Sequence, residues 1–211
     1  MRQLIAFDLD GTLVEGKDIW TLLDEQFGCV KEDKELFNLF QEGKISYEEW
    51  IKRDIEMYNS HGANRSNLAS VISHLRLSNG ALELLTSLKR NGNQMILVSD
   101  GIDLVLQQLG LEKFFDYLFI NRFQADETGI TSFIPTPYHF DDKPKALHPL
   151  IPKYDRVVFI GNGSNDVAIV KYVNSIGGLT IAVDGSEDEI KHEAKYRLKT
   201  SNLTEILEII N

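Results

Sequence analysis

The sequence predicts an α/β fold: a parallel β-sheet with helices on both faces, and a small α-helical cap inserted after the first strand. The first observation behind this prediction is a series of short apolar runs separated by helical segments, such as Met95 to Val98 and Val157 to Ile160. Strands that are apolar throughout and alternate with helices are typical of a parallel sheet covered on each side. The second observation is that residues 17–75 show helical periodicity and contain no convincing strand.

The first strand and the helical insertion follow each other at the start of the chain. Residues 4–9 form a compact apolar run that ends in an Asp-Gly pair, which breaks regular structure. Within the insertion, Ser46 and Glu49 have the spacing of a capping box and predict the start of a helix. Aromatic residues at helical spacing usually face a core, so we expect those of the insertion to pack within the cap rather than to contact substrate. They are Trp20, Phe40, Tyr47 and Trp50.

Beyond residue 80 the chain alternates regularly between helix and strand. Apolar runs predict strands at residues 95–98, 117–120, 157–160 and 180–183. Helices are predicted at residues 82–88 and 102–109, and each is followed by a glycine that favours a helix end. Residues 121–142 interrupt this rhythm with glycine and proline, so we expect a loop or a small hairpin there.

Composition limits the kinds of partner that the protein can have. The 211 residues carry 22 Lys and Arg against 32 Asp and Glu, a formal net charge of −10, and no basic tract. Nucleic acid and anionic membranes are therefore not expected partners. Cys29 is the single cysteine, and no apolar run is long enough for an export signal or a membrane span, so we expect a cytoplasmic protein. The oligomeric state is left open.

Polar residues gather where the predicted strands end. Asp8 and Asp10 follow the first strand, Ser99 the second, and Asn162 and Asp166 a later one. Because the carboxyl ends of parallel strands meet at one edge of the sheet, these side chains are expected to converge on one crevice. The alternation of an extended chain places the Asp8 and Asp10 carboxylates on the same side, close enough to share a divalent cation.

Paired carboxylates beside Mg²⁺ indicate phosphate chemistry. Mg²⁺ prefers hard oxygen ligands and would offset the repulsion between the carboxylates and an incoming phosphate. A carboxylate such as Asp8 can attack phosphorus and form an aspartyl-phosphate, while Asp10 protonates the leaving oxygen and later deprotonates water. Ser99 and Lys143 suit the role of phosphate clamps, one by hydrogen bonding and the other as a point charge.

The strand-end segments resemble the motifs of the haloacid dehalogenase (HAD) superfamily, and specifically its phosphoserine-phosphatase-like branch. The matching segments are DLDGTLV at 8–14, LVSDG at 97–101, DKPKAL at 142–147 and GNGSND at 161–166. The resemblance spans nearly the whole chain, and its first motif is the most specific. It implies a Rossmann-like, HAD-like core formed by residues 1–14 and 80–211, with residues 15–79 as a helical C1-type cap that closes over the substrate.

The same resemblance assigns the catalytic and metal-binding roles. It implies that Asp8 is both the nucleophile and a metal ligand, and that Asp10 is the general acid/base and binds the metal through its backbone carbonyl. In the fourth motif it implies metal ligation by Asn162 and Asp166. The family usually has Asp at the position of Asn162, so the loss of this charge is expected to lower the affinity for Mg²⁺.

The phosphate-binding residues are implied in the same way. Ser99 would bind the phosphate beside the backbone N–H groups of Asp100 and Gly101. Lys143 is the better match for the lysine of the third motif, and Lys145 is the alternative. The predicted substrate is a small phosphorylated metabolite.

L-phosphoserine itself is not the expected substrate. Phosphoserine phosphatases carry a Glu shortly after the first motif and an Arg in the cap, which hold the ammonium and carboxylate groups of serine. In an ungapped comparison Lys17 and Asp54 stand at those positions, with Arg53 adjacent. The inverted charges indicate a substrate with a different pattern around its phosphate.

Other functions compatible with these motifs are a HAD phosphotransferase or phosphomutase, and a phospho-ligand binding or regulatory protein with weak or no catalysis. Asn162 and the missing phosphoserine contacts favour the binding protein. The presence of Asp8, Asp10 and Asp166 together argues against it, because a binding protein needs no nucleophile beside an acid/base.

Overall fold

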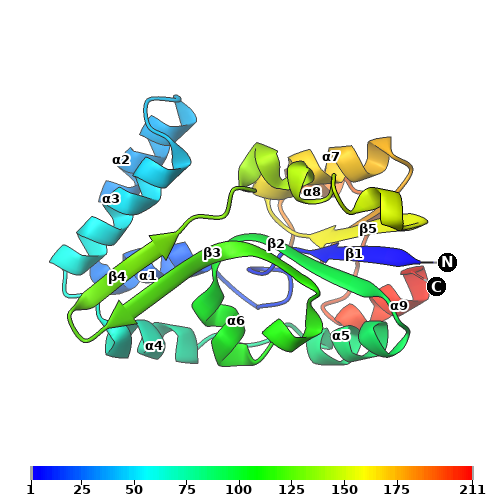
Figure 1. The fold of residues 1–211 in the computed structure, drawn as a ribbon, viewed down its shortest axis with the longest axis horizontal. Helices are drawn as coiled ribbons and strands as arrows, with labels where there is room; N and C mark the ends of the chain where they lie inside the picture. The colour runs from blue at the N-terminus through cyan, green and yellow to red at the C-terminus, as the bar shows by residue number, and fades with distance from the viewer. Residues whose placement is uncertain (1, 211) are drawn as a thin grey trace.

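A computed structural model describes residues 2–210, and a single β-sheet runs through the middle of this part of the chain (Figure 1). Its strands lie in the order β4-β3-β2-β1-β5-β6-β7. They are β1 (Gln3–Phe7), β2 (Gln94–Ile102), β3 (Tyr117–Asp126), β4 (Gly129–Ile134), β5 (Arg156–Gly161), β6 (Leu179–Ala182) and β7 (Tyr196–Arg197). Neighbouring strands are parallel except β3 and β4, which pair antiparallel. The predicted α/β fold is confirmed.

Helices cover both faces of the sheet (Figure 1). They are α1 (Ile19–Phe27), α2 (Val30–Gln41), α3 (Tyr47–Ser60), α4 (Arg65–Ser73), α5 (Ala81–Arg90), α6 (Asp103–Leu109), α7 (Val167–Ser175), α8 (Asp188–Glu193) and α9 (Ile206–Ile210). Helices α4, α5, α6 and α9 lie on one side of the sheet, and α7 and α8 lie on the other. Among residues 2–210, no helix is both long enough and apolar enough to cross a lipid bilayer.

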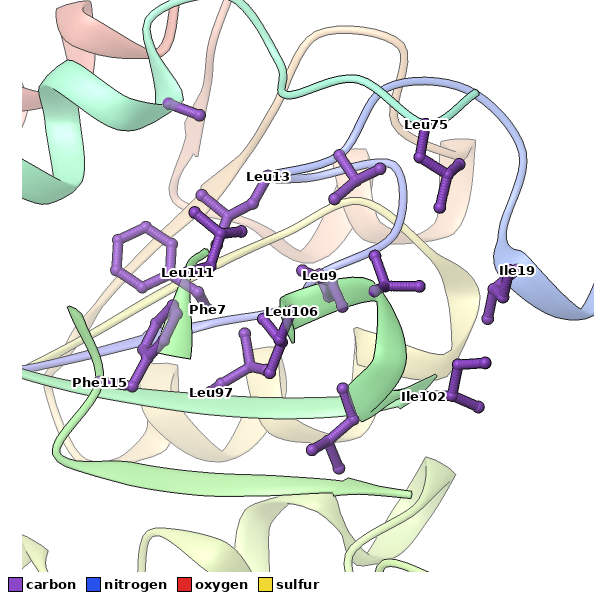
Figure 2. Packing of buried hydrophobic residues seen from close by; sticks show 14 of the residues in the cluster. Phe7, Leu9, Leu13, Ile19, Leu75, Leu97, Ile102, Leu106, Leu111 and Phe115 are labelled. Atoms are coloured by element: carbon purple, nitrogen blue, oxygen red, sulfur yellow. The ribbon is translucent and has the colours of Figure 1, made fainter. Parts of the chain in front are cut away.

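The two faces of the sheet bury separate apolar clusters, and β1 contributes to both. Ile5 and Phe7 belong to the larger cluster, whereas Leu4 and Ala6 belong to the smaller one. Successive side chains of a strand point to opposite faces, so a central strand buried on both sides must be apolar at every position. Figure 2 shows the larger cluster, where Phe7 lies close to residues from β2 and α6 and to Phe115. This packing fixes the end of β1, where the first motif begins.

The cap contains two kinds of helix. Helices α1 and α4 share the larger cluster with the sheet through residues such as Leu23 and Leu68. Helices α2 and α3 instead project from the body as a pair, and no residue of α2 is buried (Figure 1). Ser46 caps α3 by accepting a hydrogen bond from the N–H of Glu49, as the capping-box spacing predicts. The division into a core of residues 1–14 and 80–211 and a cap of residues 15–79 stays a prediction.

Residues 121–142 begin with a hairpin rather than a simple loop. Strand β3 continues to Asp126, and β4 returns beside it with Phe123 packed edge-on against Phe133 at 5.4 Å between ring centroids. Phe123 also packs edge-on against Trp20 of α1, with ring centroids 5.6 Å apart. The hairpin therefore reaches the cap and forms one wall beside it.

One side chain joins the cap to this hairpin. Asn59 of α3 donates to the carbonyl of Ile130 at 3.0 Å and accepts from the N–H of Ile130 at 2.8 Å. We expect Asn59→Ala to lower the free energy of unfolding by about 1 to 2 kcal/mol, because both hydrogen bonds are lost. Urea denaturation measures this change. Ser60→Ala is the matched control, since Ser60 hydrogen-bonds only within α3 and its end, and an equal loss in both variants would contradict the assignment.

Candidate active site

The first motif forms a tight turn at the carboxyl end of β1. The N–H of Asp8 still donates to the carbonyl of Ile160 on β5 at 3.0 Å, so this residue continues the sheet pairing. Gly11 has a φ of +72°, and a Cβ atom there would lie 2.0 Å from Nδ2 of Asn162. Only glycine suits this position, since it adopts positive φ without strain and leaves room for the Asn162 side chain. The turn thereby brings the first and fourth motifs into contact.

Lys143 lies at the centre of the site. Its ammonium is 3.2 Å from the carboxylate of Asp8, 2.6 Å from that of Asp166 and 3.6 Å from that of Asp100, and its side chain is fully buried. The short 3-10 helix Phe140–Ala146 delivers it to this position. Lys145 instead pairs with Asp142 at 2.6 Å, and its side chain is 59% exposed. Of the two lysines that the sequence left open, Lys143 is the one beside the candidate nucleophile.

Asp166 has partners on both carboxylate oxygens. Oδ1 accepts from Lys143, and Oδ2 accepts from the N–H groups of Asn162 and Gly163 at 3.1 and 3.3 Å. These contacts hold Lys143 and the turn after β5 in a fixed relation. Metal ligation by Asp166 stays a prediction.

Asn162 points across the turn of the first motif. Its Oδ1 accepts from the hydroxyl of Thr12 at 3.2 Å, and its side chain lies over Gly11. It lines the same cavity as Asp8 and Asp10. The amide oxygen is thus placed beside both predicted metal-binding carboxylates.

The second motif lies at the end of β2. Ser99 Oγ accepts from the N–H of Gly101 at 3.1 Å, and both residues line the cavity with Asp8 and Asp10. A Cβ atom on Gly101 would lie 2.6 Å from Oδ2 of Asp10, so glycine lets the Asp10 carboxylate approach the backbone closely. The sequence-predicted residues from all four motifs therefore lie around one site.

Several residues that hold the second motif were not singled out from the sequence for this role. The carbonyl of Asp100 accepts from Trp20 Nε1 at 2.8 Å and from Asn121 Nδ2 at 2.7 Å. Its carboxylate accepts from Asn165 Nδ2 at 2.8 Å. Asn121 comes from β3, inside the segment predicted as a loop or hairpin, and it also donates to the Tyr47 hydroxyl at 2.8 Å. No sequence pattern marks such contacts, because the partners come from four distant segments.

A cavity of about 370 Å³ connects these motifs to the cap. Its cap side is lined by residues of α1, α2 and α3, and Phe140 closes another side. Trp20, Tyr47 and Trp50 all line this cavity, whereas their helical spacing predicted that they pack within the cap and do not contact substrate. Phe40 is not among the lining residues, and it instead stacks on Trp50 at 5.1 Å between centroids. The cap aromatics thus serve both packing and the cavity wall.

Burial and neighbouring charges set the protonation of the catalytic groups. Burial, followed by the charge of Asp18, raises the pKa of Asp10 to about 7, while the N–H of Ile19 opposes this shift. Burial also raises the pKa of Asp8, with Asp166 adding to the effect and Lys143 opposing it. Burial acts to lower the pKa of Lys143, but its three carboxylate neighbours outweigh burial and raise it. Lys143 therefore stays charged, and Asp10 can exchange a proton near neutral pH.

The cap contributes a second group of carboxylates, from Asp24, Asp33 and Asp54. Asp24 accepts from the Tyr58 hydroxyl at 2.6 Å, and Asp33 accepts from Trp50 Nε1 at 3.0 Å. Asp54 is 1% exposed, and its Oδ1 has no hydrogen-bond partner. Burial and the charges of Asp33 and Asp24 raise the pKa of Asp54 to about 9, and burial raises that of Asp24 to about 7.

The donors at the turn fit a magnesium ion. Two carboxylates and an amide oxygen, from Asp8, Asp10 and Asn162, face one cavity, and the buried Oδ1 of Asp10 has no hydrogen-bond partner. Hard oxygen donors of this kind suit Mg²⁺. Within residues 2–210 no group of three or more His, Cys, Asp or Glu side chains could hold a metal ion, and the amide oxygen of Asn162 is a further oxygen donor at this cavity.

The class of protein follows from where the acidic residues lie. Buried carboxylates and a lysine at the carboxyl edge of a parallel sheet, facing a cavity lined by helices, fit an enzyme of α/β fold that acts through a carboxylate nucleophile. Residues 3–174 match the family model described as haloacid dehalogenase-like hydrolase. The chain belongs to this haloacid dehalogenase-like hydrolase family.

Individual relatives agree with the family. The phosphoserine phosphatase of Methanocaldococcus jannaschii is 25% identical over 214 residues, covering 99% of this chain and 98% of the relative. The pyridoxal phosphate phosphatase of Rattus norvegicus is 28% identical over 197 residues, covering 82% and 79%. A solved substrate-bound phosphoserine phosphatase complex superposes with a TM-score of 0.76 at 25% identity, covering 100% and 99%. The predictions of the phosphoserine-phosphatase-like branch and of a HAD-type phosphatase are confirmed.

Replacing Lys143 tests its place at the centre of the site. We expect Lys143→Met to lower the free energy of unfolding by about 3 to 5 kcal/mol at pH 7, because buried carboxylates lose their counter-charge. Lys145→Met is the matched control and should change it by less than about 0.5 kcal/mol, since Lys145 is exposed. Urea denaturation of the two variants measures the difference. Equal losses would show that burial of Lys143 does not decide stability.

The raised pKa of Asp54 predicts a pH dependence of stability. A carboxyl group whose pKa rises from 3.8 to about 9 on folding favours the folded state at low pH, and this stabilisation is lost as pH rises toward 9. Asp54→Asn removes the titration, so its melting temperature should fall less than that of the wild type between pH 5 and pH 8. Thermal melts at both pH values test this, with exposed Glu48→Gln as the control. An equal fall in melting temperature in Asp54→Asn and the wild type would contradict the raised pKa of Asp54.

Proposed function

We propose that the protein is a Mg²⁺-dependent phosphomonoesterase that acts through an aspartyl-phosphate on a small phosphorylated metabolite other than L-phosphoserine. The observation that carries this proposal is the contact of the Asp8 carboxylate with the buried Lys143 ammonium, inside a cavity that also contains Asp10 and Ser99. Phosphatase names among relatives that span most of the chain support it. With a single cysteine at Cys29, we place the enzyme in the cytoplasm.

Each step of the proposed reaction has a residue in the described site. A carboxylate oxygen of Asp8 attacks phosphorus as the P–O bond to the alcohol breaks, and Asp10 gives its proton to the departing oxygen. Water then attacks the aspartyl-phosphate, Asp10 takes a proton from this water, and inorganic phosphate leaves with Asp8 restored. Lys143 and the Ser99 hydroxyl would balance the charge of the transferring group.

The metal would be held by Asp8, Asp10 and Asn162. When bound, Mg²⁺ neutralises phosphate charge and orients the phosphoryl group. Asp166 is the fourth proposed metal ligand, and it also positions Lys143, because its carboxylate accepts from that ammonium and from two backbone N–H groups. L-phosphoserine is disfavoured because neither cationic candidate lines the cavity: Lys17 pairs with Glu25, and Arg53 pairs with Glu49.

Substitutions at Asp8 and Asn162 test the mechanism. We expect phosphate release from an aryl phosphate with Mg²⁺ to fall at least a thousandfold in Asp8→Asn, because the nucleophile is lost. Asn162→Asp should lower the Mg²⁺ concentration needed for half-maximal rate, since a carboxylate replaces an amide beside the metal. Colorimetric phosphate assays over a Mg²⁺ series measure both.

The same assay separates the alternatives. If Asn162→Asp releases phosphate and the wild type does not, the result would favour a phospho-ligand binding protein. The uncharged side chain of Asn162 is the observation that motivates this alternative. Phosphate retained on a product or acceptor, instead of released, would favour a phosphotransferase or phosphomutase. Full release from Asp8→Asn would contradict the proposed nucleophile.

A further inference from the structure

The cavity extends beyond the phosphate end into the cap, and its chemistry changes there. The end near Asp8 is defined by the motif residues, whereas the cap end is lined by Asp18, Thr21, Asp24 and Asp33. If phosphorus lies beside Asp8, the alcohol that leaves must occupy the cap end. The residues at this end therefore decide which alcohol the enzyme accepts.

Negative charge dominates the lining. Carboxylates come from the motifs, from the cap and from Glu187, and no Lys, Arg or His of residues 2–210 is among the lining residues. The nearest ammonium, that of Lys143, is buried behind Asp8 and is already paired with Asp8, Asp100 and Asp166. A carboxylate on the alcohol would consequently meet like charge with no cation to pair with.

The cap carboxylates are themselves incompletely paired. Asp54 lies behind the lining, next to Asp33 and Asp24, whose charges act on its buried carboxyl group, and its Oδ1 has no hydrogen-bond partner. Crowding of carboxylates in a buried setting is unfavourable unless protons or a cation compensate them. Burial raises the pKa of Asp33 as it does those of Asp24 and Asp54, so protons compensate part of this charge, and a cation bound beside Asp33 would take over that role.

Aromatic rings form the other walls of this end. Trp50 donates its indole N–H to Asp33 at 3.0 Å, which holds the ring beside the carboxylate. Phe37 packs against Trp50 with centroids 5.2 Å apart, and Phe37, Trp20 and Phe140 also line the cavity. Aromatic faces attract ammonium and quaternary ammonium groups, and this attraction grows when water is excluded. Rings and carboxylates together suit an organic cation better than a metal ion.

We propose that the cap end of the cavity selects phosphomonoesters whose alcohol carries an ammonium or quaternary ammonium group and no carboxylate, with Asp33 as the principal charge partner. The inference rests on the proposed phosphatase function, since it uses Asp8 to define the phosphate end. The cavity volume of about 370 Å³ is at the small end of ligand pockets and suits a short amino alcohol.

Binding measured without turnover tests the selection directly. Phosphocholine is compared with 3,3-dimethylbutyl phosphate, which has the same shape with carbon in place of the charged nitrogen. Both are titrated calorimetrically into Asp8→Asn protein with Mg²⁺. We expect phosphocholine to bind about tenfold more tightly. Equal affinities, or tighter binding of L-phosphoserine, would overturn the proposal.

A matched pair of variants assigns the effect to Asp33. Built on Asp8→Asn, the further change Asp33→Asn should reduce the ratio of the two affinities toward one, because the charge goes while the shape stays. Glu32→Gln is the control: Glu32 is exposed in the same first turn of α2 and does not line the cavity. An unchanged ratio in Asp33→Asn, or an equal fall in both variants, would overturn the role of Asp33.

Turnover by the wild type separates this inference from the proposed function. Hydrolysis of an aryl phosphate with no preference in kcat/KM for phosphocholine over its neutral isostere would overturn the substrate class and leave the phosphatase function standing. A preference for pyridoxal phosphate over phosphocholine would also overturn it, by making ring stacking the deciding contact. Selective binding of phosphocholine without turnover of any ester would support the cation site and contradict the phosphatase function.

Discussion

The buried ammonium of Lys143 is the interaction on which the site depends. It joins carboxylates that three separate strand ends deliver, Asp8 after β1, Asp100 at the end of β2 and Asp166 after β5. Without this cation, these carboxylates would be close, buried and mutually repulsive. Their pKa values would rise, and they would take up protons. One lysine therefore opposes the rise in the pKa of the nucleophile Asp8 that burial causes, and it fixes the relative positions of three motifs. The sheet brings the motifs to one edge, and Lys143 holds them there.

The strands and helices of the core could be predicted because their signals are local. The apolar runs that became β1, β2, β5 and β6 must be apolar on both faces, and this requirement is visible in the sequence. The continuation of β3 to Asp126 has no such signal, since exposed polar residues such as Gln124 alternate there with buried ones. Strand β7 is only two residues long and depends wholly on pairing with β6. Tertiary contacts form both of these elements.

The motif residues could also be located in advance, whereas their pairings could not. Spacing alone does not distinguish Lys143 from Lys145, because the 3-10 helix that buries one and exposes the other forms only against α7 and the sheet. Asp166 carries the residue type of a metal ligand, but the sequence does not show that its oxygens also accept from Lys143 and two backbone N–H groups. The cap end of the cavity is assembled from α1, α2 and α3, so no single segment of sequence reveals it.

The two ends of the cavity pose opposite electrostatic problems, and this contrast constrains the substrate. A phosphate brings negative charge to a protein whose net charge is −10 and whose cavity lining is acidic, so its binding relies on Lys143, backbone N–H groups and a divalent ion at one end. None of these can also neutralise the cap carboxylates, because Lys143 is enclosed behind Asp8. With a neutral alcohol, Asp33 and Asp24 would depend on bound protons for compensation, because burial raises the pKa of both. A cationic alcohol compensates them and reduces the overall repulsion between substrate and enzyme, which is the physical reason for linking an acidic, aromatic cap to a phosphate site.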